Sequence, residues 1–345
     1  MLDSIEYKKV LIDLLNIDSV SGQSGEIETF ISEFIRDFGG DPILMNKGGV
    51  YVDIGGDSKD ILYITAHCDT IGFMIKSINC DGTMKIMNIG GSKVTSIEDR
   101  NIIIHTRKGK NYTGVIYRTH SCQQIAPDGF YNEIASFDSN LCVVLDEKVS
   151  NKTDVEQLGI NVGDIISLEP NYKFTANGFI KSHYLDNKVS VAMLLLLARD
   201  IVVNNRKLNH HVIFGFTMYE EVGHGSAWIP KHTKCVLSID AACTGPSSNT
   251  TERTVTIYTA DVRSPYHSLM INSLLHHAES ASCDAVLDVL SPRGSTECMS
   301  SIFSGNDVQF GTIGPGIRGM HGYERTHIES IENTYRLLSE YILKS

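Results

Sequence analysis

Strand and helix signals alternate in the first quarter and the second half of this chain, while strand signals dominate the stretch between them. From Gly25 to Phe38, apolar residues recur at the i, i+3, i+4 spacing of an amphipathic helix, which ends at Gly39-Gly40. Two short β-rich runs follow, Val50–Ile54 and Ile61–Ala66. The alternation resumes after residue 186, with helices predicted over Val189–Val203, Tyr266–His277 and Ser330–Leu343 and strands over His211–Met218, Cys235–Asp240 and Val308–Ile313.

Between residues 74 and 176, short strand-like segments are separated by Asp-Gly, Gly-Gly and Lys-Gly turn signals. Turns at this spacing predict an antiparallel β domain, most simply a small barrel. Only Thr153–Leu158 indicates a helical turn. The predicted strands are Lys85–Ile89, Ile102–Thr106, Thr113–Tyr117, Cys142–Leu145 and Ile165–Leu168.

These two sequence patterns predict an α/β fold, a mixed sheet with helices on both faces that carries an inserted antiparallel β-barrel. We expect one discontinuous domain from residues 1–73 and 177–345 and a barrel domain from residues 74–176. For the barrel domain we expect a role in oligomerisation or in substrate access.

The charge balance excludes several classes of partner. Lys and Arg number 30 against 41 Asp and Glu, for a formal net charge of -11 over 345 residues. Nucleic acids and anionic membranes attract clustered Lys and Arg, so we expect neither as a partner. No apolar run reaches the roughly 18 residues that a membrane span requires.

The eight cysteines are spread singly and form no CxxC pair, which argues against a zinc ribbon or a thioredoxin-like site. The N-terminal sequence MLDSIEYKKVLIDLL is charged and amphipathic, without the apolar region of a signal peptide. We therefore expect a cytoplasmic protein with reduced thiols.

Three predicted strands of the α/β part run directly into residues that bind divalent metals. The first ends at His67, the second is followed by Glu220 and Glu221, and the third ends at Asp240. Ligands of open α/β sheets bind outside the carboxyl ends of the strands, so these side chains are expected to converge. Asp186, just before a predicted helix, is a fourth contributor.

Each contributor has an ordinary structural explanation when it is taken alone. Asp240 resembles a solvated strand-end residue, and Asp186 resembles a helix N-cap. A Glu-Glu pair is common on helix surfaces, and a single buried His is more often hydrogen-bonded than metal-bound. The Glu220-Glu221 pair, however, follows a wholly apolar strand and precedes Val-Gly-His-Gly, which does not begin an amphipathic helix. The prediction of a metal site therefore depends on the set rather than on any one member.

The chemistry of the set suits two divalent cations. Asp186, Glu221 and Asp240 supply three negative charges, and a bridging hydroxide would neutralise the remaining charge of two cations. A hydroxide of this kind is the nucleophile of two-metal hydrolases. Mixed imidazole and carboxylate ligands suit zinc, cobalt or manganese.

Two further residues have expected roles beside the ligands. Glu220 is adjacent to a ligand and is placed to take a proton from water and return it to the leaving amine, as a general base and acid. Asp69, two residues past His67, is placed to accept the other N–H of the imidazole and fix its orientation.

Five segments of the chain resemble the tetrahedral-assembly and deblocking (glutamyl) aminopeptidases, in the order in which that family carries them. The barrel insertion also falls where that family has its own. The matching segments are Thr65–Gly72 (TAHCDTIG), Ser182–Lys188 (SHYLDNK), Glu220–Gly223 (EEVG), Ser238–Asp240 (SID) and Gly314–His321 (GPGIRGMH), the last leading into Glu324–His327 (ERTH).

The resemblance implies a ligand set for two metals. His67 and Asp240 would complete one metal, Glu221 and His321 the other, and Asp186 would bridge both. It also implies Glu220 as the general base and Asp69 as the residue that orients His67.

His321 enters only through the resemblance, because a His in a Gly-rich loop is weak evidence by itself. Three other histidines compete for its role, with His327 ranked next and His224 and His183 after it.

Two positions depart from the family pattern. Asn187 stands where many relatives have a second Asp after the bridging one, a position that is not a ligand. The segment Gly294–Cys298 carries Glu297 where relatives have Gly-Thr-Asp or Gly-Ser-Asp. Either Glu297 takes over the role of that Asp, or this chain lacks that role. The difference is expected to affect contacts with the substrate and to leave the metal ligands intact.

The main prediction is an aminopeptidase that removes N-terminal residues from short peptides. An alternative is a two-metal deacylase or amidohydrolase of N-acyl compounds. A carboxylate facing the free amine, from Glu220 or Glu297, would favour the peptidase. A non-enzymatic binding protein would have lost a ligand or the base, and none is lost. A glycosidase, a label some relatives have carried, needs two carboxylates and no metal.

The resemblance also implies a homo-oligomer, up to a tetrahedral dodecamer.

Overall fold

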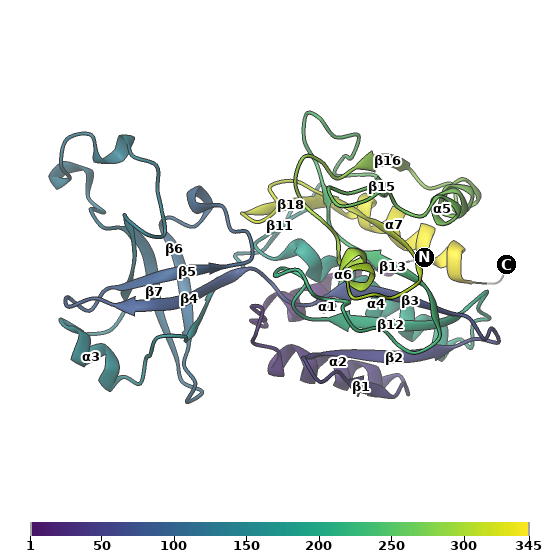
Figure 1. Ribbon diagram of the computed structural model, residues 1–345, viewed down its shortest axis with the longest axis horizontal. Helices are drawn as coiled ribbons and strands as arrows, with labels where there is room; N and C mark the ends of the chain where they lie inside the picture. Colours follow the sequence, from purple (N-terminus) through teal and green to yellow (C-terminus); the bar gives the residue numbers. More distant parts are fainter. Residues whose placement is uncertain (1, 344–345) are drawn as a thin grey trace. The chain divides into compact units, whose positions relative to one another are not determined.

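The computed structural model describes residues 2–343 (Figure 1). The chain divides into two compact units, one made of the residues up to Asp69 and from Asn171 onward, the other of Thr70–Pro170. Among the described residues, no helix has both the length and the apolar character needed to cross a lipid bilayer.

The larger unit is built on a nine-stranded mixed sheet. Its central strands are parallel neighbours, whereas antiparallel pairs occur nearer the two edges. The strand order is β1 (Pro42–Leu44), β2 (Gly49–Gly55), β12 (His211–Thr217), β3 (Ile61–His67), β13 (Thr233–Ile239), β17 (Gln309–Ile317), β15 (Val255–Ala260) and β16 (Ala285–Val289), with β14 (Ala242–Cys243) paired to β17.

The three strands that carry predicted ligands lie side by side at the centre of this sheet. Strand β3 pairs in parallel with β12 on one side and β13 on the other. Thr217 lies opposite His67 in the register of β12 and β3, so the two strands end together. Their residues are almost wholly buried, as is typical of parallel strands covered on both faces.

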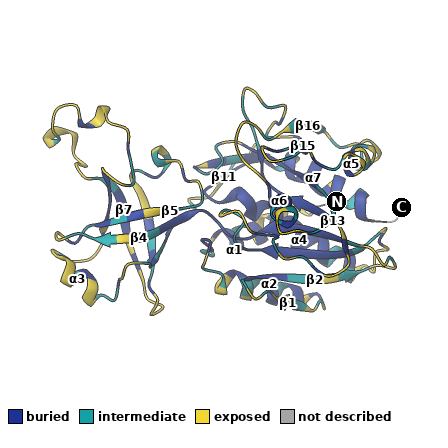
Figure 2. Cartoon of the chain, viewed as in Figure 1, coloured by how far each residue is buried: buried dark blue, intermediate teal, exposed yellow. Residues whose placement is uncertain are grey.

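Within the described residues of this unit, six helices pack against the sheet or against one another. The longest, α4, is buried along most of its length, which Figure 2 shows as a dark blue helix. A helix that is apolar on all sides is a core helix. The six helices are α1 (Ser4–Leu15), α2 (Gly25–Asp37), α4 (Leu185–Val203), α5 (Ser268–Ser280), α6 (Glu297–Phe303) and α7 (Ile328–Ile342).

A small antiparallel sheet brings two distant segments of the larger unit together. It consists of β10 (Lys173–Phe174), β11 (Phe179–Ser182) and β18 (Glu324–His327). Ser182 pairs with Glu324, so the segment entering α4 lies beside the segment that follows His321.

The smaller unit is a closed barrel of six antiparallel strands in the order β4 (Gly72–Ile78), β5 (Met84–Ile89), β8 (Leu141–Leu145), β7 (Asn111–Arg118), β6 (Arg100–His105) and β9 (Ile165–Leu168). Buried and more exposed residues alternate along several of these strands. The short helix α3 (Lys152–Gln157) matches the predicted helical turn, and three 3₁₀ turns lie at Val94–Ser96, Gln123–Ile125 and Phe130–Asn132. The mixed sheet and the barrel confirm the predicted fold class.

Candidate metal centre

The ends of β3, β12 and β13 bring the predicted side chains into one buried cluster. His67 is the last residue of β3, and Asp240 directly follows β13. Glu220 and Glu221 lie in the turn that follows β12. Parallel strands present their carboxyl ends at the same edge of a sheet, which is why residues so distant in sequence meet here.

The first group of candidate ligands consists of His67, Asp186 and Asp240, whose ligand atoms all lie within 4.8 Å of one another. Nε2 of His67 is 3.2 Å from Oδ1 of Asp186 and 3.6 Å from Oδ1 of Asp240. All three residues are buried. One imidazole and two carboxylates are thus turned toward a common point.

The second group consists of Asp186, Glu221 and His321, again with ligand atoms within 4.8 Å. Nε2 of His321 lies 3.3 Å from Oε2 of Glu221 and 3.6 Å from Oδ2 of Asp186. Asp186 belongs to both groups and turns one carboxylate oxygen toward each histidine. This is the arrangement expected of a carboxylate that bridges two cations.

The three histidines that competed with His321 have other surroundings. His327 accepts the N–H of Glu329 at the start of α7, and its Nε2 lies 2.8 Å from the carbonyl of Asn177. Nδ1 of His183 lies 2.8 Å from the carbonyl of Gly322. His224 is exposed and stacks on Tyr219. Of these four histidines, only His321 belongs to a candidate ligand group among the described residues.

Asp69 contacts both His67 and the turn that carries the two glutamates. Nδ1 of His67 lies 3.0 Å from the backbone carbonyl of Asp69 and 3.6 Å from its carboxylate, so the nearer partner is the main chain. The carboxylate accepts the N–H groups of Glu220 and Glu221 at 3.1 and 3.3 Å and the hydroxyl of Ser21 at 2.5 Å. Asp69 therefore connects the end of β3, at His67, to the turn that follows β12. The sequence analysis did not anticipate its contact with that turn.

Glu220 faces the cluster without belonging to either ligand group. Its Oε2 lies 3.8 Å from Nε2 of His67, and its side chain is 15% exposed. Burial, followed by the neighbouring carboxylates, raises its pKa well above the usual value, although His67 opposes the rise. A carboxylate with a raised pKa beside a hydrolytic centre suits proton transfer.

Glu324 is a site residue that the sequence analysis did not single out. Its two carboxylate oxygens accept the backbone N–H of Asp186 at 3.0 Å and that of His321 at 2.9 Å. The side chain is buried, and burial raises its pKa to about 8. One carboxylate thus fixes the main chain of two candidate ligands from segments far apart in sequence. Its place at the start of the Glu324–His327 segment, three residues after His321, was the signal that could have pointed to it.

The electrostatics of the cluster fit divalent cations. Burial lowers the pKa of His67, but the surrounding carboxylates raise it well above its usual value. They likewise raise the pKa of His321 to about 10 against the effect of burial. Burial raises the pKa of Glu221 to about 8, although His321 opposes it. A cation in each group would supply the positive charge that the clustered carboxylates attract, with the Nε2 atoms of both histidines available as ligands. The donor set suits zinc, cobalt or manganese.

The two departures from the family pattern lie near the centre but outside both ligand groups. Asn187 is buried and donates from its amide nitrogen to the carbonyl of Ile239, directly before Asp240. Glu297 is only 2% exposed, and its carboxylate accepts the hydroxyl of Thr217. Glu297 is therefore turned into the protein interior, whereas Glu220 faces the cluster.

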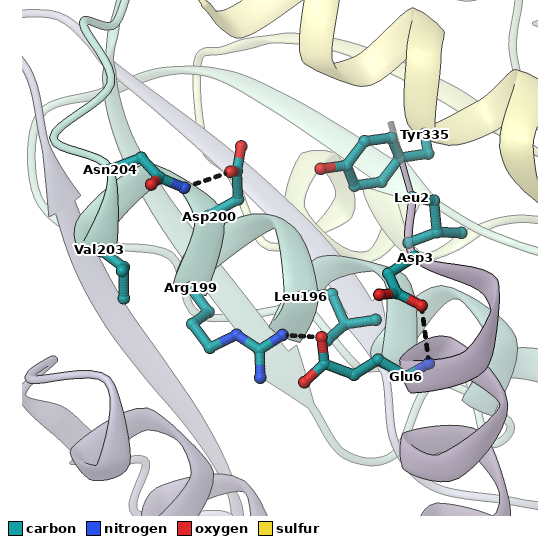
Figure 3. Close-up of a pocket in the computed structure, with 9 residues that line it drawn as sticks. All are labelled: Leu2, Asp3, Glu6, Leu196, Arg199, Asp200, Val203, Asn204 and Tyr335. Atoms are coloured by element: carbon teal, nitrogen blue, oxygen red, sulfur yellow. Dashed lines mark hydrogen bonds and ion pairs between the residues drawn. The ribbon is translucent and has the colours of Figure 1, made fainter.

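A surface pocket of about 220 Å³ lies elsewhere in the same unit (Figure 3). It is formed by the start of α1, the later turns of α4 and a residue of α7. Its wall begins ten residues along α4 from Asp186, about 15 Å at the helical rise. Within the pocket, Arg199 forms an ion pair with Glu6, and the side-chain amide of Asn204 donates a hydrogen bond to Asp200. This pocket is separate from the metal centre.

Comparison with known proteins identifies the family. The sequence profile of the M42 glutamyl aminopeptidases matches residues 48–337. YhfE of Bacillus subtilis strain 168, a candidate aminopeptidase, is 35% identical over 336 residues, which cover 97% of this chain and 96% of YhfE. The chain belongs to the M42 glutamyl aminopeptidase family. It is therefore an aminopeptidase, a hydrolase of peptide bonds, from a metallopeptidase family.

Two further proteins extend the likeness. The glutamyl aminopeptidase of Lactococcus lactis subsp. cremoris strain MG1363 is 26% identical over 213 residues, 61% of this chain and 58% of that protein. The structure of the Pyrococcus horikoshii TET1 peptidase, which can assemble into a tetrahedron or a large octahedral shell, matches with a TM-score of 0.84 at 22% identity. That match covers 97% of this chain and 98% of the other and shows a shared fold.

Proposed function

We propose that this M42 family member is a two-metal aminopeptidase. His67 and Asp240 hold one cation, Glu221 and His321 hold the other, and Asp186 bridges them. The observation that carries the proposal is the pair of candidate ligand groups that share Asp186, each with its ligand atoms within 4.8 Å. The proposed cofactors are two divalent ions per chain, zinc first, with cobalt or manganese as alternatives.

When bound, two such cations supply Lewis acidity that polarises the scissile carbonyl and promotes ionisation of water. Glu220 accepts the proton of the attacking water and returns it to the leaving amine. Asp69 holds the backbone of Glu220 and Glu221, and its carbonyl keeps the His67 ring turned so that Nε2 faces the cluster. Glu324 holds the backbone of Asp186 and His321 in the same way.

The proposed substrates are short peptides from which single N-terminal residues are removed. Glu220 is the carboxylate best placed to face a free α-amine, since Glu297 is buried against Thr217. We also propose that the chain forms a homo-oligomer in a reducing cytoplasm, up to a dodecamer, with the barrel unit contributing to assembly or substrate access. The eight cysteines form no disulfide, and the Pyrococcus horikoshii relative assembles into shells, which supports both proposals.

The deciding experiment combines metal removal with a substrate panel. Exhaustively chelated protein is assayed on aminoacyl and N-acyl chromogenic substrates after zinc, cobalt or manganese is added back singly. We expect activity on free aminoacyl substrates to vanish on chelation and to return with one of the metals. Activity that survives chelation would eliminate the metal mechanism, and turnover of N-acyl substrates alone would replace the aminopeptidase with a deacylase. Size-exclusion chromatography with light scattering measures the number of chains in the assembly.

A further inference from the structure

Glu297 is a buried acidic residue to which the proposed function gives no role. It begins α6, and Oε1 of its carboxylate accepts the hydroxyl of Thr217, the last residue of β12. Its backbone carbonyl accepts the hydroxyl of Ser226 at 2.7 Å. These two contacts flank residues 218–226, which we call the base loop because it carries Glu220.

Gly225 forms the direct link between Glu297 and Glu220. A Cβ added at Gly225 would lie 2.7 Å from Oε1 of Glu297 and 3.2 Å from both Cα and Cβ of Glu220. The backbone at Gly225 is therefore packed between the two acidic residues, with no room for a side chain. The packing at Gly225 therefore links the Glu297 carboxylate to the main chain of Glu220.

Lys47 holds the base loop through a second set of contacts. Its ammonium group donates to the carbonyls of His224 and Gly225, the second at 2.5 Å. Burial lowers the pKa of Lys47, while the charges of Glu297 and Asp69 act in the opposite direction. Lys47 thus lies close enough to both acids to be influenced by their charges while it bonds the loop.

We propose that Glu297 and Lys47 are positioning residues that hold the base loop and thereby keep the carboxylate of Glu220 at the metal centre. The inference rests on the proposed function, because it assigns the action of both residues to Glu220. Asp69 fixes the middle of the loop at Glu220 and Glu221, whereas Glu297 and Lys47 fix its later part. A general base displaced by about 1 Å loses on the order of 10²-fold in rate. The buried acid at position 297 therefore serves the loop rather than the substrate.

The first test substitutes Glu297. Glu297→Ala is expected to lower kcat by about 10- to 100-fold, while KM and the metal content per chain stay close to wild type. The loss falls on kcat because a general base acts in the transition state and not in substrate binding. Glu297→Gln keeps an oxygen for the Thr217 hydroxyl and the same length, and is expected to retain kcat within about threefold. If the alanine variant binds metal normally and keeps wild-type kcat, the proposal is overturned.

The second test asks whether Glu297 acts through Glu220. Residual activity is measured in Glu220→Gln and in the double variant Glu220→Gln/Glu297→Ala. If Glu297 only positions Glu220, its removal costs nothing further once the base is gone, so the two effects do not add. A double variant slower by the full Glu297→Ala factor would contradict the proposal. If Glu220→Gln itself keeps wild-type activity, the proposed general base fails, which is a different result from failure of the loop contacts.

The third test uses Lys47, which approaches the loop without contacting a ligand group. Lys47→Met keeps the length of the side chain and removes its donors, and is expected to lower kcat by about tenfold without loss of metal. Lys59→Met, at an exposed lysine of the same unit, is the matched control and should match wild type. Equal kcat values in the Lys47 and Lys59 variants would remove Lys47 from the proposal.

Discussion

The two halves of the candidate metal centre are built differently. The inner half consists of His67, the last residue of β3, and Asp240, which directly follows β13. These two strands are neighbours at the centre of the sheet, and the His67 side chain is 1% exposed. The outer half, Glu221 with His321, lies on two loops, and the His321 side chain is 31% exposed. His321 also has a backbone φ of 61°, a left-handed conformation that is uncommon for residues other than glycine. Strands thus fix one half, whereas loop contacts fix the other.

This difference leads us to expect two unequal metal sites. An ion held by buried strand-end residues exchanges slowly, because water and chelators reach it poorly. An ion held by a part-exposed loop histidine exchanges faster and depends more on the residues that hold the loop. Asp186 is common to both halves, so its removal should abolish the difference.

The largest effect is expected from Asp186→Ala. Because this carboxylate is turned toward both histidines, its loss should release both ions and reduce activity to background. Metal content is measured by mass spectrometry of the desalted protein. Asp200→Ala, on a later turn of the same helix, is the matched control and should keep both ions. Full metal stoichiometry in the Asp186 variant would contradict its bridging role.

Glu220→Gln comes next in size. Loss of a general base typically lowers the rate by about 10²–10⁴-fold, and we expect kcat to fall within that range. Metal content should stay near two ions per chain, because Glu220 belongs to neither ligand group. Release of an ion from this variant would show that Glu220 is a ligand instead.

The third prediction separates the two halves directly. His321→Ala removes a proposed ligand, so it should weaken the outer ion by more than the roughly 10- to 100-fold that is typical of losing a partner behind a ligand. The inner ion should stay bound, and excess metal should restore part of the activity. His67→Ala should release the inner ion, which excess metal restores less well. His327→Ala serves as the control, since that ring lies at the start of α7. Equal loss of both ions from both variants would show that the halves are not distinct.

The smallest effect is expected from Glu324→Gln. The amide keeps one oxygen acceptor but loses the second, so the main chain of either Asp186 or His321 loses its partner. We expect the outer ion to bind about tenfold more weakly and kcat at saturating metal to change little. A metal titration measures the effect, and an unchanged affinity would leave Glu324 with a purely structural role.

Much of the fold could be predicted because hydrophobic periodicity reports which residues are buried. The predicted helix from Val189 lies within α4, whose first residues after Leu185 depart from helical geometry at Asp186 and Asn187. Helix α6 was not predicted, because its seven residues are too few to show a period and include a buried acid. Strands β15 and β16 were also missed. They lie toward an edge of the sheet, where β16 is less buried than the central strands.

The candidate site was predictable to the extent that it follows strand ends. His67, Asp240 and the Glu220-Glu221 pair each follow an apolar strand, and the parallel topology brings them together. His321 depends on a loop conformation that has no periodic signal, so only family resemblance pointed to it. The contacts of Glu324 and Glu297 with backbone N–H groups, a hydroxyl and a glycine depend on three-dimensional packing, and no sequence pattern encodes them.

The candidate ligands are scattered along the chain from His67 to His321, and this has a consequence for biosynthesis. The ribosome makes the chain from its N-terminus onward. A growing chain in which β3, α4 and β13 have already emerged from the ribosome therefore still lacks His321, which follows β17. Contacts between such distant segments form late in folding. Under the proposed ligand set, an incomplete chain can therefore gather one half of the centre but not both until synthesis has passed residue 321.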